Sequence, residues 1–421
     1  MKKLLTKYLN KLDSQGLASK NNAIFMGLDD RLFVNRTDKK DISELRKLFE
    51  LMSINSILFA EPSEPYRSII NEITRDDYPN RNSIETITPT DCETRTFLHD
   101  IPVVKNFSAQ LLSEALSKSK SSILKDLGIV AYGTVTPEQA FVSYSSTCFA
   151  CYVKYFVDAI YYFDTCLQKK KEPNERFLRS FIKIANHLKK TSPYEIFKDK
   201  FSISSAISKK PKTTGEVIKS ITETGLVVVK LHLVDSYFGN ISYVFGDNIY
   251  ISQTGASLDD LESCIDKVPL NGSSSVGITS SSELPTHKRI YEETSHKAIL
   301  HAHPRFSVIM SMFCPYKNCP SFNDRKICHT TCAEDRYVSE LQIVPGEIGT
   351  GKTAILNTVP KAIKKTSGVI VYGHGVFTIG KEDFKEALML MIDIEKKSYE
   401  MYFEKIDEYF SQYRTFLPGL I

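Results

Sequence analysis

The chain has 421 residues, 42% of them apolar and 25% charged, which is the composition of a soluble globular protein. Its length allows two domains of ordinary size. The net charge of +4, from 54 basic and 50 acidic residues, is too small to indicate binding to nucleic acid or to a membrane surface. No apolar run approaches the length of a membrane span.

The N-terminal segment combines a basic start with Lys7 and Lys11, which interrupt the apolar core that a signal peptide needs. We interpret this segment as an amphipathic helix. The chain has nine cysteines, an odd number, and no recognisable secretion signal. This combination predicts a cytoplasmic, reducing location with thiols that are free or bound to metal.

Two segments of the first half of the chain resemble segments of the second half. Residues 22–38 resemble residues 240–255, with Phe33 on Ile251, and residues 128–134 resemble residues 368–374, with Tyr132 on Tyr372. The offsets of 218 and 240 differ by 22 residues, and we expect most of this surplus in residues 313–336. The pattern predicts two tandem copies of one α/β unit, at 1–175 and 213–421, joined by a helical connection and linker at 176–212. In the first copy, Thr136 and Gln139 predict a capping box that opens a helix.

The stretch from Ile299 to Met310 places His301 and His303 two residues apart in an apolar, β-prone run. On a strand, the side-chain period of two sends both imidazoles to the same face. A third imidazole, His374, follows the apolar run 369–372, which we predict to be a buried strand that ends at glycines. Three neutral imidazoles on one divalent ion leave a coordination position open, as in catalytic zinc sites. Any one of these histidines alone would be explained more simply as a core or surface residue.

The first copy is predicted to lack these ligands. It has Thr134 where the second copy has His374, and the segment that we align with the histidine pair, residues 83–91, contains no histidine. In the second copy, residues 272–285 form a loop of small residues that leads into a helix. Such a loop is either a flexible linker or a phosphate-binding loop.

Four cysteines of the second copy have C-x4-C-x8-C-x3-C spacing, with His329 among them: Cys314, Cys319, Cys328 and Cys332. This spacing fits a small structural zinc site, because a loop too short to bury a core can be held by a metal ion. Unligated thiols are the alternative. Cys148 and Cys151 lie in an apolar helical stretch, and we interpret them as core residues rather than a redox motif.

Residues 346–353 satisfy the P-loop pattern GxxxxGK[ST]. The pattern binds phosphate only between a buried parallel strand and a helix. Pro345 directly precedes the first glycine, and we can assign no acidic strand end to magnesium. A glycine-rich turn that enters a helix at 353–363 is therefore favoured over a nucleotide site at Lys352.

Five motifs of the second copy, taken in order, resemble those of the class II aldolase/adducin family, over roughly residues 213–410. They are Gly239-Asn240-Ile241-Ser242, Thr254-Gly255, Ser281-Ser282-Glu283, His301-Ala302-His303-Pro304 and Gly373-His374-Gly375. The resemblance implies an α/β fold of two tandem three-layer α/β/α domains, each around a mixed, largely antiparallel sheet, with a degenerate first copy.

The resemblance also implies a site and an activity. His301, His303 and His374 would hold a divalent ion, most often zinc, and Glu283 would be the catalytic acid/base. A substrate phosphate would be held by Asn240, Thr254, Gly255, Ser281 and Ser282. The implied activity is that of a metal-dependent lyase of the aldolase type, which acts on a small phosphorylated sugar, aldehyde or related hydroxy-carbonyl compound through an enediolate. A sugar-phosphate epimerase or dehydratase and a non-catalytic, adducin-like assembly module are alternatives, and a P-loop NTPase is a minor one.

Members of this family often supply a tyrosine or an acidic residue near the subunit boundary, and in this chain the cysteine segment replaces that region. We name Tyr316 and Tyr337 as candidate proton donors. Because the family commonly forms fourfold rings, we expect a homodimer in which the first copies take alternate positions of a pseudo-fourfold ring.

Overall fold

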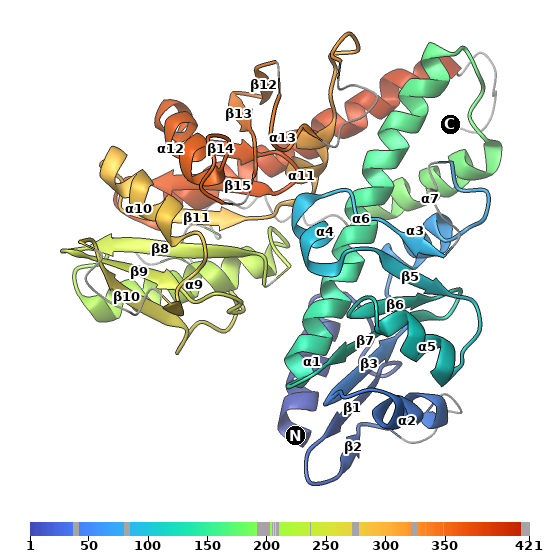
Figure 1. The fold of residues 1–421 in the computed structure, drawn as a ribbon. Helices are drawn as coiled ribbons and strands as arrows, with labels where there is room; N and C mark the ends of the chain where they lie inside the picture. Colours follow the sequence, from blue (N-terminus) through green and yellow to red (C-terminus); the bar gives the residue numbers. More distant parts are fainter. Residues whose placement is uncertain are drawn as a thin grey trace. The chain divides into compact units, whose positions relative to one another are not determined.

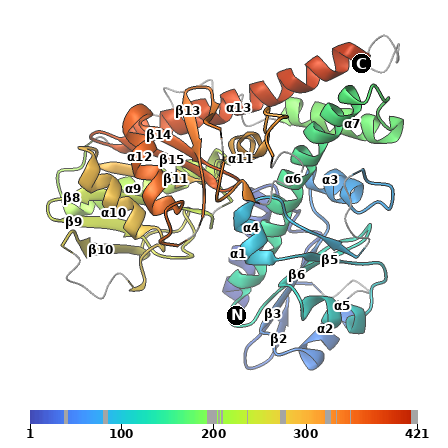
Figure 2. The ribbon, with the colours of Figure 1, turned by 45° about the horizontal axis from the view of Figure 1, so that its top comes forward.

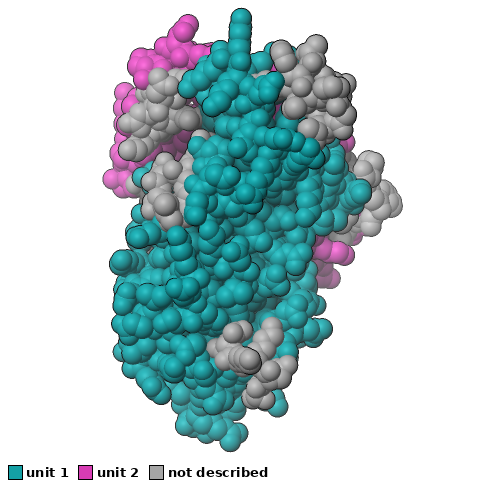
Figure 3. Space-filling model, turned by 90° about the vertical axis from the view of Figure 1, so that its right-hand side faces the viewer, with its two compact units in different colours: residues 1–191, 409–421 teal, residues 192–408 magenta. Residues whose placement is uncertain are grey.

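The computed structural model describes residues 1–36, 42–79, 85–191, 203, 205, 207, 210–235, 237–271, 278–320, 327–332, 334–347 and 349–413. It divides into two compact units, shown in different colours in Figure 3. Unit 1 consists of residues 1–191 and 409–421, and unit 2 of residues 192–408. The helical connection predicted from residue 176 thus begins with a helix of unit 1, and most of the interval from 192 to 209 lies outside the described residues.

Unit 1 is a seven-stranded sheet with helices on both faces (Figure 1). Its strands are β1 (Ile24–Leu28), β2 (Leu32–Val34), β3 (Ser56–Ala60), β4 (Thr86–Ile87), β5 (Ile101–Val104), β6 (Ser121–Leu124) and β7 (Gly128–Gly133). Its helices are α1 (Lys2–Ser14), α2 (Ile42–Leu51), α3 (Tyr66–Ile73), α4 (Cys92–Leu98), α5 (Ala109–Leu116), α6 (Pro137–Gln168) and α7 (Glu175–Thr191). The amphipathic N-terminal segment forms α1, and the predicted capping box opens α6. Cys148 and Cys151 are buried in α6, and burial raises the pKa of the Cys151 thiol to about 12, as expected of core residues.

Unit 2 is built on an eight-stranded sheet. Its strands are β8 (Gly239–Phe245), β9 (Asn248–Ser252), β10 (Ile265–Pro269), β11 (Ala298–Ala302), β12 (Arg336–Val338), β13 (Leu341–Val344), β14 (Gly368–Val371) and β15 (Gly375–Gly380). Its helices are α9 (Thr214–Lys230), α10 (Leu284–Glu293), α11 (Arg305–Met312), α12 (Ile355–Thr366) and α13 (Phe384–Tyr413), the last of which ends in unit 1. Within the described part of the chain, none of the helices combines the length and the hydrophobicity that crossing a membrane requires.

In each unit the sheet is the middle of three layers. In unit 2, Ile299 and Phe377 pack in one apolar cluster with residues of α10 and α12, which lie side by side in Figure 2. On the opposite face, Tyr243 of β8 contacts Phe384 of α13, with ring centroids 5.8 Å apart. Unit 1 has the same plan, because α2 and α5 cover one face of its sheet and α6 packs against β3 and β7. The predicted mixed α/β fold with two sheets is confirmed.

The two sheets share one strand order. It is β2-β1-β3-β7-β6-β5-β4 in unit 1 and β9-β8-β11-β15-β14-β13-β12 in unit 2, where β10 is added beyond β9. Each sheet pairs two of these strands in parallel, β5 with β6 and β13 with β14, and pairs the other neighbours antiparallel. The helices also correspond, since α5 and α12 both lie in the parallel crossover. This agreement supports the predicted duplication.

The strand pairings correct our alignment of the two copies. Strands β6 and β7 correspond to β14 and β15, so Gly128 matches Gly375 rather than Gly368, and the offset is 247 (375 − 128). The turns before β7 and β15 support this offset, because Asp126 and Gly373 become equivalent and both have a positive φ, of 62° and 57°. The sequence was misleading here because buried apolar strands resemble one another in composition.

The surplus residues of unit 2 also lie elsewhere than we expected. Phe59 pairs with Ile24 in unit 1, and His301 pairs with Asn240 at the same place in unit 2. Phe59 is therefore equivalent to His301, with an offset of 242 (301 − 59), and Ile24 to Asn240, with an offset of 216 (240 − 24). Unit 2 therefore gains 26 residues (242 − 216) before β11, in the part that contains β10, and 5 more (247 − 242) between β11 and β15. The expectation that most of the surplus falls in residues 313–336 is wrong.

Candidate metal centre

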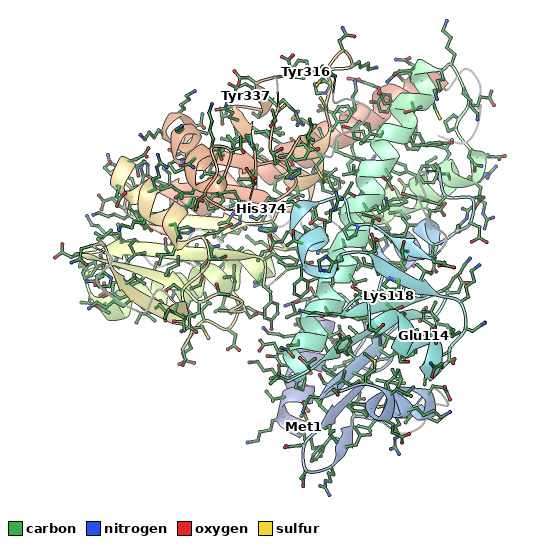
Figure 4. The ribbon with its side chains drawn as sticks, viewed as in Figure 1. Met1, Glu114, Lys118, Tyr316, Tyr337 and His374 are labelled. Atoms are coloured by element: carbon green, nitrogen blue, oxygen red, sulfur yellow. The ribbon has the colours of Figure 1, made fainter. Side chains whose placement is uncertain are left out.

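The three histidines come from neighbouring elements of the unit 2 sheet. His301 lies on β11 and His303 directly follows it, whereas His374 lies in the turn between β14 and β15 (Figure 4). Because β15 pairs with β11, this turn is brought to the histidine pair. A Cβ added to Gly375 would lie 2.5 Å from the Ala302 carbonyl oxygen and 2.7 Å from His303 Cδ2, so the close approach requires glycine.

The geometry of the three imidazoles fits one metal ion. Their ligand atoms all lie within 4.8 Å of one another, and Nε2 of His301 is 3.0 Å from Nε2 of His303. An ion held tetrahedrally at about 2.0–2.1 Å separates its nitrogen ligands by roughly 3.3 Å. All three side chains are buried. Across the described residues, no other group of three or more His, Cys, Asp or Glu side chains has this arrangement.

The surroundings keep the imidazoles neutral and oriented. His301 Nδ1 lies 3.0 Å from the Val376 carbonyl oxygen, so Nδ1 donates a hydrogen bond and the Nε2 lone pair faces the other two rings. Burial lowers the pKa of His301 to about 4 and the pKa of His303 well below its usual value. Neutral imidazole is the form that binds metal ions.

Glu283 immediately precedes α10, and its side chain meets the same nitrogens. Its carboxylate oxygens lie 3.1 Å from His374 Nε2 and 3.5 Å from His301 Nε2, and Asn240 Nδ2 donates a hydrogen bond of 2.7 Å to Oε2. Burial acts to raise the pKa of Glu283, but His301, His374 and Asn240 outweigh it and hold this pKa well below its usual range. The carboxylate is therefore ionised at neutral pH.

Two of the predicted phosphate-binding segments lie together. Ser282 N donates to Thr254 Oγ1 at 3.0 Å, and Thr254 Oγ1 donates to the Ser280 carbonyl oxygen at 3.1 Å. Gly255 has a φ of +68°, and Ser281 Oγ accepts from Glu283 N at 3.3 Å. The fifth predicted residue, Asn240, reaches this region through Glu283. Residues 272–277, the first part of the small-residue loop, lie outside the described residues.

Unit 1 has other side chains at the ligand positions. In the corrected alignment, Phe59 is equivalent to His301, Glu61 to His303 and Leu127 to His374. These residues replace Thr134 and residues 83–91, which the sequence alignment had matched to the histidines. Phe59 is buried in an apolar cluster, and its ring centroid lies 5.3 Å from that of Phe107. Unit 1 therefore packs an aromatic ring where unit 2 has the first imidazole.

The two candidate proton donors lie away from the histidines. Tyr316 and Tyr337 are 39% and 51% exposed, and Figure 4 shows both at an outer edge of unit 2, apart from His374. The Tyr316 hydroxyl donates to the Asp335 carbonyl oxygen at 3.3 Å. Neither side chain reaches the histidine site of its own chain.

The P-loop pattern has the flanking elements that the sequence analysis did not assign to it. β13 precedes it, α12 follows it, and β13 pairs in parallel with β14. The loop itself is unsuited to phosphate, because the Glu347 carboxylate accepts a hydrogen bond of 2.6 Å from Thr353 Oγ1 and brings a negative charge into it. Lys352 is exposed, and Ile348 lies outside the described residues.

The sequence analysis missed a buried polar network beside the site. Ser242 Oγ lies 2.6 Å from His287 Nδ1 and 2.7 Å from the Tyr291 hydroxyl. Burial lowers the pKa of His287 to about 3. His287 follows Glu283 by four residues, so helical spacing from Glu283 was the signal that could have pointed to it.

The fold and the histidine cluster define unit 2 as an α/β domain with a three-histidine site suited to a divalent ion. Residues 219–402 match the family described as the Class II Aldolase and Adducin N-terminal domain. The resemblance inferred from the sequence is confirmed. No curated protein matches the chain.

Several solved structures, among them two aldolases, are similar to about half of the chain. One is L-fuculose-1-phosphate aldolase from Thermus thermophilus, with 20% identity and a TM-score of 0.36 over 46% of this chain and 97% of that one. The other is a sugar-phosphate aldolase from Thermotoga maritima, with 18% identity and a TM-score of 0.33 over 46% of this chain and 96% of that one.

Proposed function

We propose that unit 2 is a divalent-metal-dependent lyase of the aldolase type, which acts on a small phosphorylated sugar or a related hydroxy-carbonyl compound. The observation that carries this proposal is the convergence of three buried, neutral imidazoles beside an ionised carboxylate. The match of residues 219–402 to the class II aldolase/adducin family supports the same reaction class.

The residues would divide the work as follows. His301, His303 and His374 hold the ion, for which zinc is our first choice because imidazole suits it. The ion, when bound, supplies Lewis acidity that draws electron density from a substrate carbonyl and favours an enediolate. Glu283 takes the proton from the carbon beside that carbonyl in the direction of synthesis and returns it in the direction of cleavage. The hydrogen bond from Asn240 keeps the carboxylate oriented for this transfer.

The substrate phosphate would bind at the turns of Thr254, Gly255, Ser281 and Ser282. The hydrogen bonds between these turns support a single binding region, and Thr254, Gly255 and Ser282 are exposed there. Backbone N–H groups and hydroxyls at the start of a helix are suited to an anion. The region adjoins Glu283, so a small phosphorylated substrate would reach both groups.

The decisive experiment is a screen of aldehydes with dihydroxyacetone phosphate, using the full chain with and without added zinc. We expect metal-dependent carbon–carbon bond formation. It should be lost in the His301→Ala/His303→Ala variant together with the metal, and lost in Glu283→Gln with the metal retained. His187→Ala, which changes a histidine of α7, is the matched control and should keep both metal and turnover. A wild-type protein whose histidines bind no divalent ion would overturn the proposal.

The likeness of the two units supports a second proposal, which concerns assembly. A homodimer would contain four aldolase-like units, of which two carry metal ligands, and could close into a pseudo-fourfold ring. Light scattering should then give twice the mass of the 421-residue chain. A strictly monomeric mass over the working concentration range would contradict the ring.

A further inference from the structure

The strand register of unit 2 places an aromatic ring opposite one of the proposed metal ligands. β8 pairs antiparallel with β11, and Gly239 lies opposite Ala302 at the end of this pairing. One step further along the same register, Phe238 comes opposite His303. The two rings stack, with their centroids 5.6 Å apart and an angle of 17° between their planes.

The chain is fixed on both sides of this aromatic pair. On one side, Gly239 has a φ of +123°, and a Cβ there would lie 2.5 Å from the His301 carbonyl oxygen, so the two strands approach closely. On the other side, Arg305 Nη2 donates a hydrogen bond of 3.1 Å to Asp235 Oδ1, and both side chains are largely buried. Phe238 itself is 7% exposed. Its ring is therefore held in place by the structure around it.

The His303 ring has less polar support than the His301 ring. His301 Nδ1 lies 3.0 Å from the Val376 carbonyl oxygen, and a hydrogen bond of this kind usually orients an imidazole that binds metal. His303 Nδ1 is buried and has no hydrogen-bond partner in the part of the chain that the structure describes. His303 Nε2 nevertheless faces the site, because it lies 3.0 Å from His301 Nε2. Packing must therefore orient the His303 ring.

Phe238 is the packing partner of His303 that is not itself a proposed ligand. The rings of His301 and His374 have centroids 4.8 Å from that of His303, but both belong to the ligand set. Gly375 approaches His303 Cδ2 closely and has no side chain. Replacing Phe238 thus removes support from the His303 ring and leaves all three imidazoles in the chain.

The aromatic face of Phe238 is suited to an imidazole that carries an ion. An imidazole bound to a divalent cation takes on part of the positive charge of the ion. The face of a phenyl ring is electron-rich and attracts such a ring more strongly than it attracts a neutral one. A contact that strengthens when the ion binds raises the affinity for the ion. An aliphatic side chain of similar size would fill the space without this effect.

Unit 1 lacks both members of the pair. The offsets derived from the strand pairings put Asn22 at the position of Phe238 and Glu61 at the position of His303. Both side chains are exposed. The aromatic ring is thus present in the unit that has the three imidazoles and is replaced in the unit that does not.

We propose that Phe238 is a positioning residue for the metal centre, whose ring holds His303 in its ligating orientation and favours the ion-bound imidazole. Loss of a side chain that orients a metal ligand weakens metal binding by about 10- to 100-fold. The inference rests on the metal binding proposed above, but it does not depend on the reaction or the substrate assigned to the site.

Zinc affinity of the full chain, measured by competition with a chromophoric chelator, tests this directly. Phe238→Leu keeps an apolar side chain but removes the aromatic face, and it should bind zinc about tenfold more weakly than the wild type or worse. Phe238→Tyr keeps the face and should bind zinc as the wild type does. The matched control is Phe245→Ala, which removes a ring from the far end of β8 and should keep the wild-type affinity.

The visible spectrum of the cobalt-substituted protein gives a second readout. At saturating cobalt, Phe238→Leu should change the metal absorption bands because one ligand has lost its orientation, whereas Phe238→Tyr should keep them. Urea unfolding of the metal-free proteins shows whether each variant folds, and Phe238→Met replaces Phe238→Leu if the latter does not.

The possible outcomes separate this inference from the proposed reaction. Weaker zinc binding in Phe238→Leu than in Phe238→Tyr supports the inference, even if no aldolase turnover is found. Equal zinc binding in Phe238→Leu and the wild type would overturn it and leave the aldolase proposal intact. A Phe238→Tyr variant that binds zinc as weakly as Phe238→Leu would overturn it as well, and a wild type that binds no divalent ion would overturn both proposals.

Discussion

Asn240 Nδ2 donates a hydrogen bond of 2.7 Å to Glu283 Oε2, and this contact joins the first strand of unit 2 to the start of α10. Asn240 is paired with His301 in the sheet, so the same strand register that positions a proposed metal ligand also positions the partner of the carboxylate. The carboxylate of Glu283, our proposed acid/base, is thereby tied to the histidine cluster by two elements that are far apart in the sequence.

Asn240→Ala should move the acid limb of the pH–rate profile to higher pH. Asn240 helps to hold the pKa of Glu283 low, so its removal raises that pKa, and the active carboxylate form is lost at a higher pH. A hydrogen bond to a charged group contributes about 1.5–3 kcal/mol, so a shift of about 1–2 pH units is expected. The pH dependence of turnover at saturating zinc measures it. An unchanged acid limb would show that this contact does not tune Glu283.

Glu395→Ala should destabilise unit 2 and loosen the histidine pair. The buried Glu395 carboxylate accepts hydrogen bonds of 2.9 Å from Phe306 N, and of 2.8 Å from both Ser307 N and Ser307 Oγ, at the start of α11. Loss of such a cap leaves buried donors unsatisfied and costs about 2–4 kcal/mol. Denaturant unfolding measures this cost. The control is Glu400→Ala on the same helix, whose half-exposed side chain should contribute less than about 0.5 kcal/mol.

The histidine centre could be predicted because its signals are local. The side-chain period of a strand places His301 and His303 on one face, and the glycines around His374 indicate a turn at the end of a buried strand. The structure brings these three residues together, as this reasoning expected. The role of Asn240 as the partner of Glu283 was less accessible, because a contact across 43 residues depends on the fold rather than on spacing.

The alignment of the two copies could not be obtained from composition. The apolar segments at β7, β14 and β15 satisfy the same pattern, and only pairing across the sheet shows that Gly128 corresponds to Gly375. For the P-loop pattern, the sequence analysis did not recognise the flanking elements, although β13 precedes the pattern and α12 follows it. What separates it from a phosphate site is the Glu347 carboxylate inside the loop, whose contact with Thr353 is visible only in three dimensions.

The stability of unit 1 should depend on pH through Asp91. Burial raises the pKa of this carboxyl to about 6, above its usual value near 3.8, although Thr94 donates two hydrogen bonds to it. A raised folded pKa means that the folded state binds the proton more tightly than the unfolded state. The stabilising contribution is therefore complete below pH 4 and is lost as the pH rises through 6, at a cost of about 3 kcal/mol.

Asp91→Asn isolates this effect, because an amide can still accept the hydrogen bond from Thr94 N. The difference in unfolding free energy between wild type and variant should change by about 2.4 kcal/mol from pH 4 to pH 7, in favour of the variant at the higher pH. Urea unfolding at several pH values gives the difference. A difference that stays constant over this range would mean that Asp91 ionises normally in the folded chain.

Phe59→Ala should separate the packing role of unit 1 from the metal binding that we propose for unit 2. Phe59 is 6% exposed and occupies the position of His301, so truncation leaves a cavity between β3 and the cluster that contains Phe107. A cost of about 3–5 kcal/mol to the unfolding of unit 1 is expected. The zinc content should stay as in the wild type, because the ligands lie in unit 2. Unfolding and metal content, measured on the same variant, show whether unit 1 contributes to metal binding. A loss of histidine-bound zinc in this variant would mean that unit 1 is needed to form the proposed metal site.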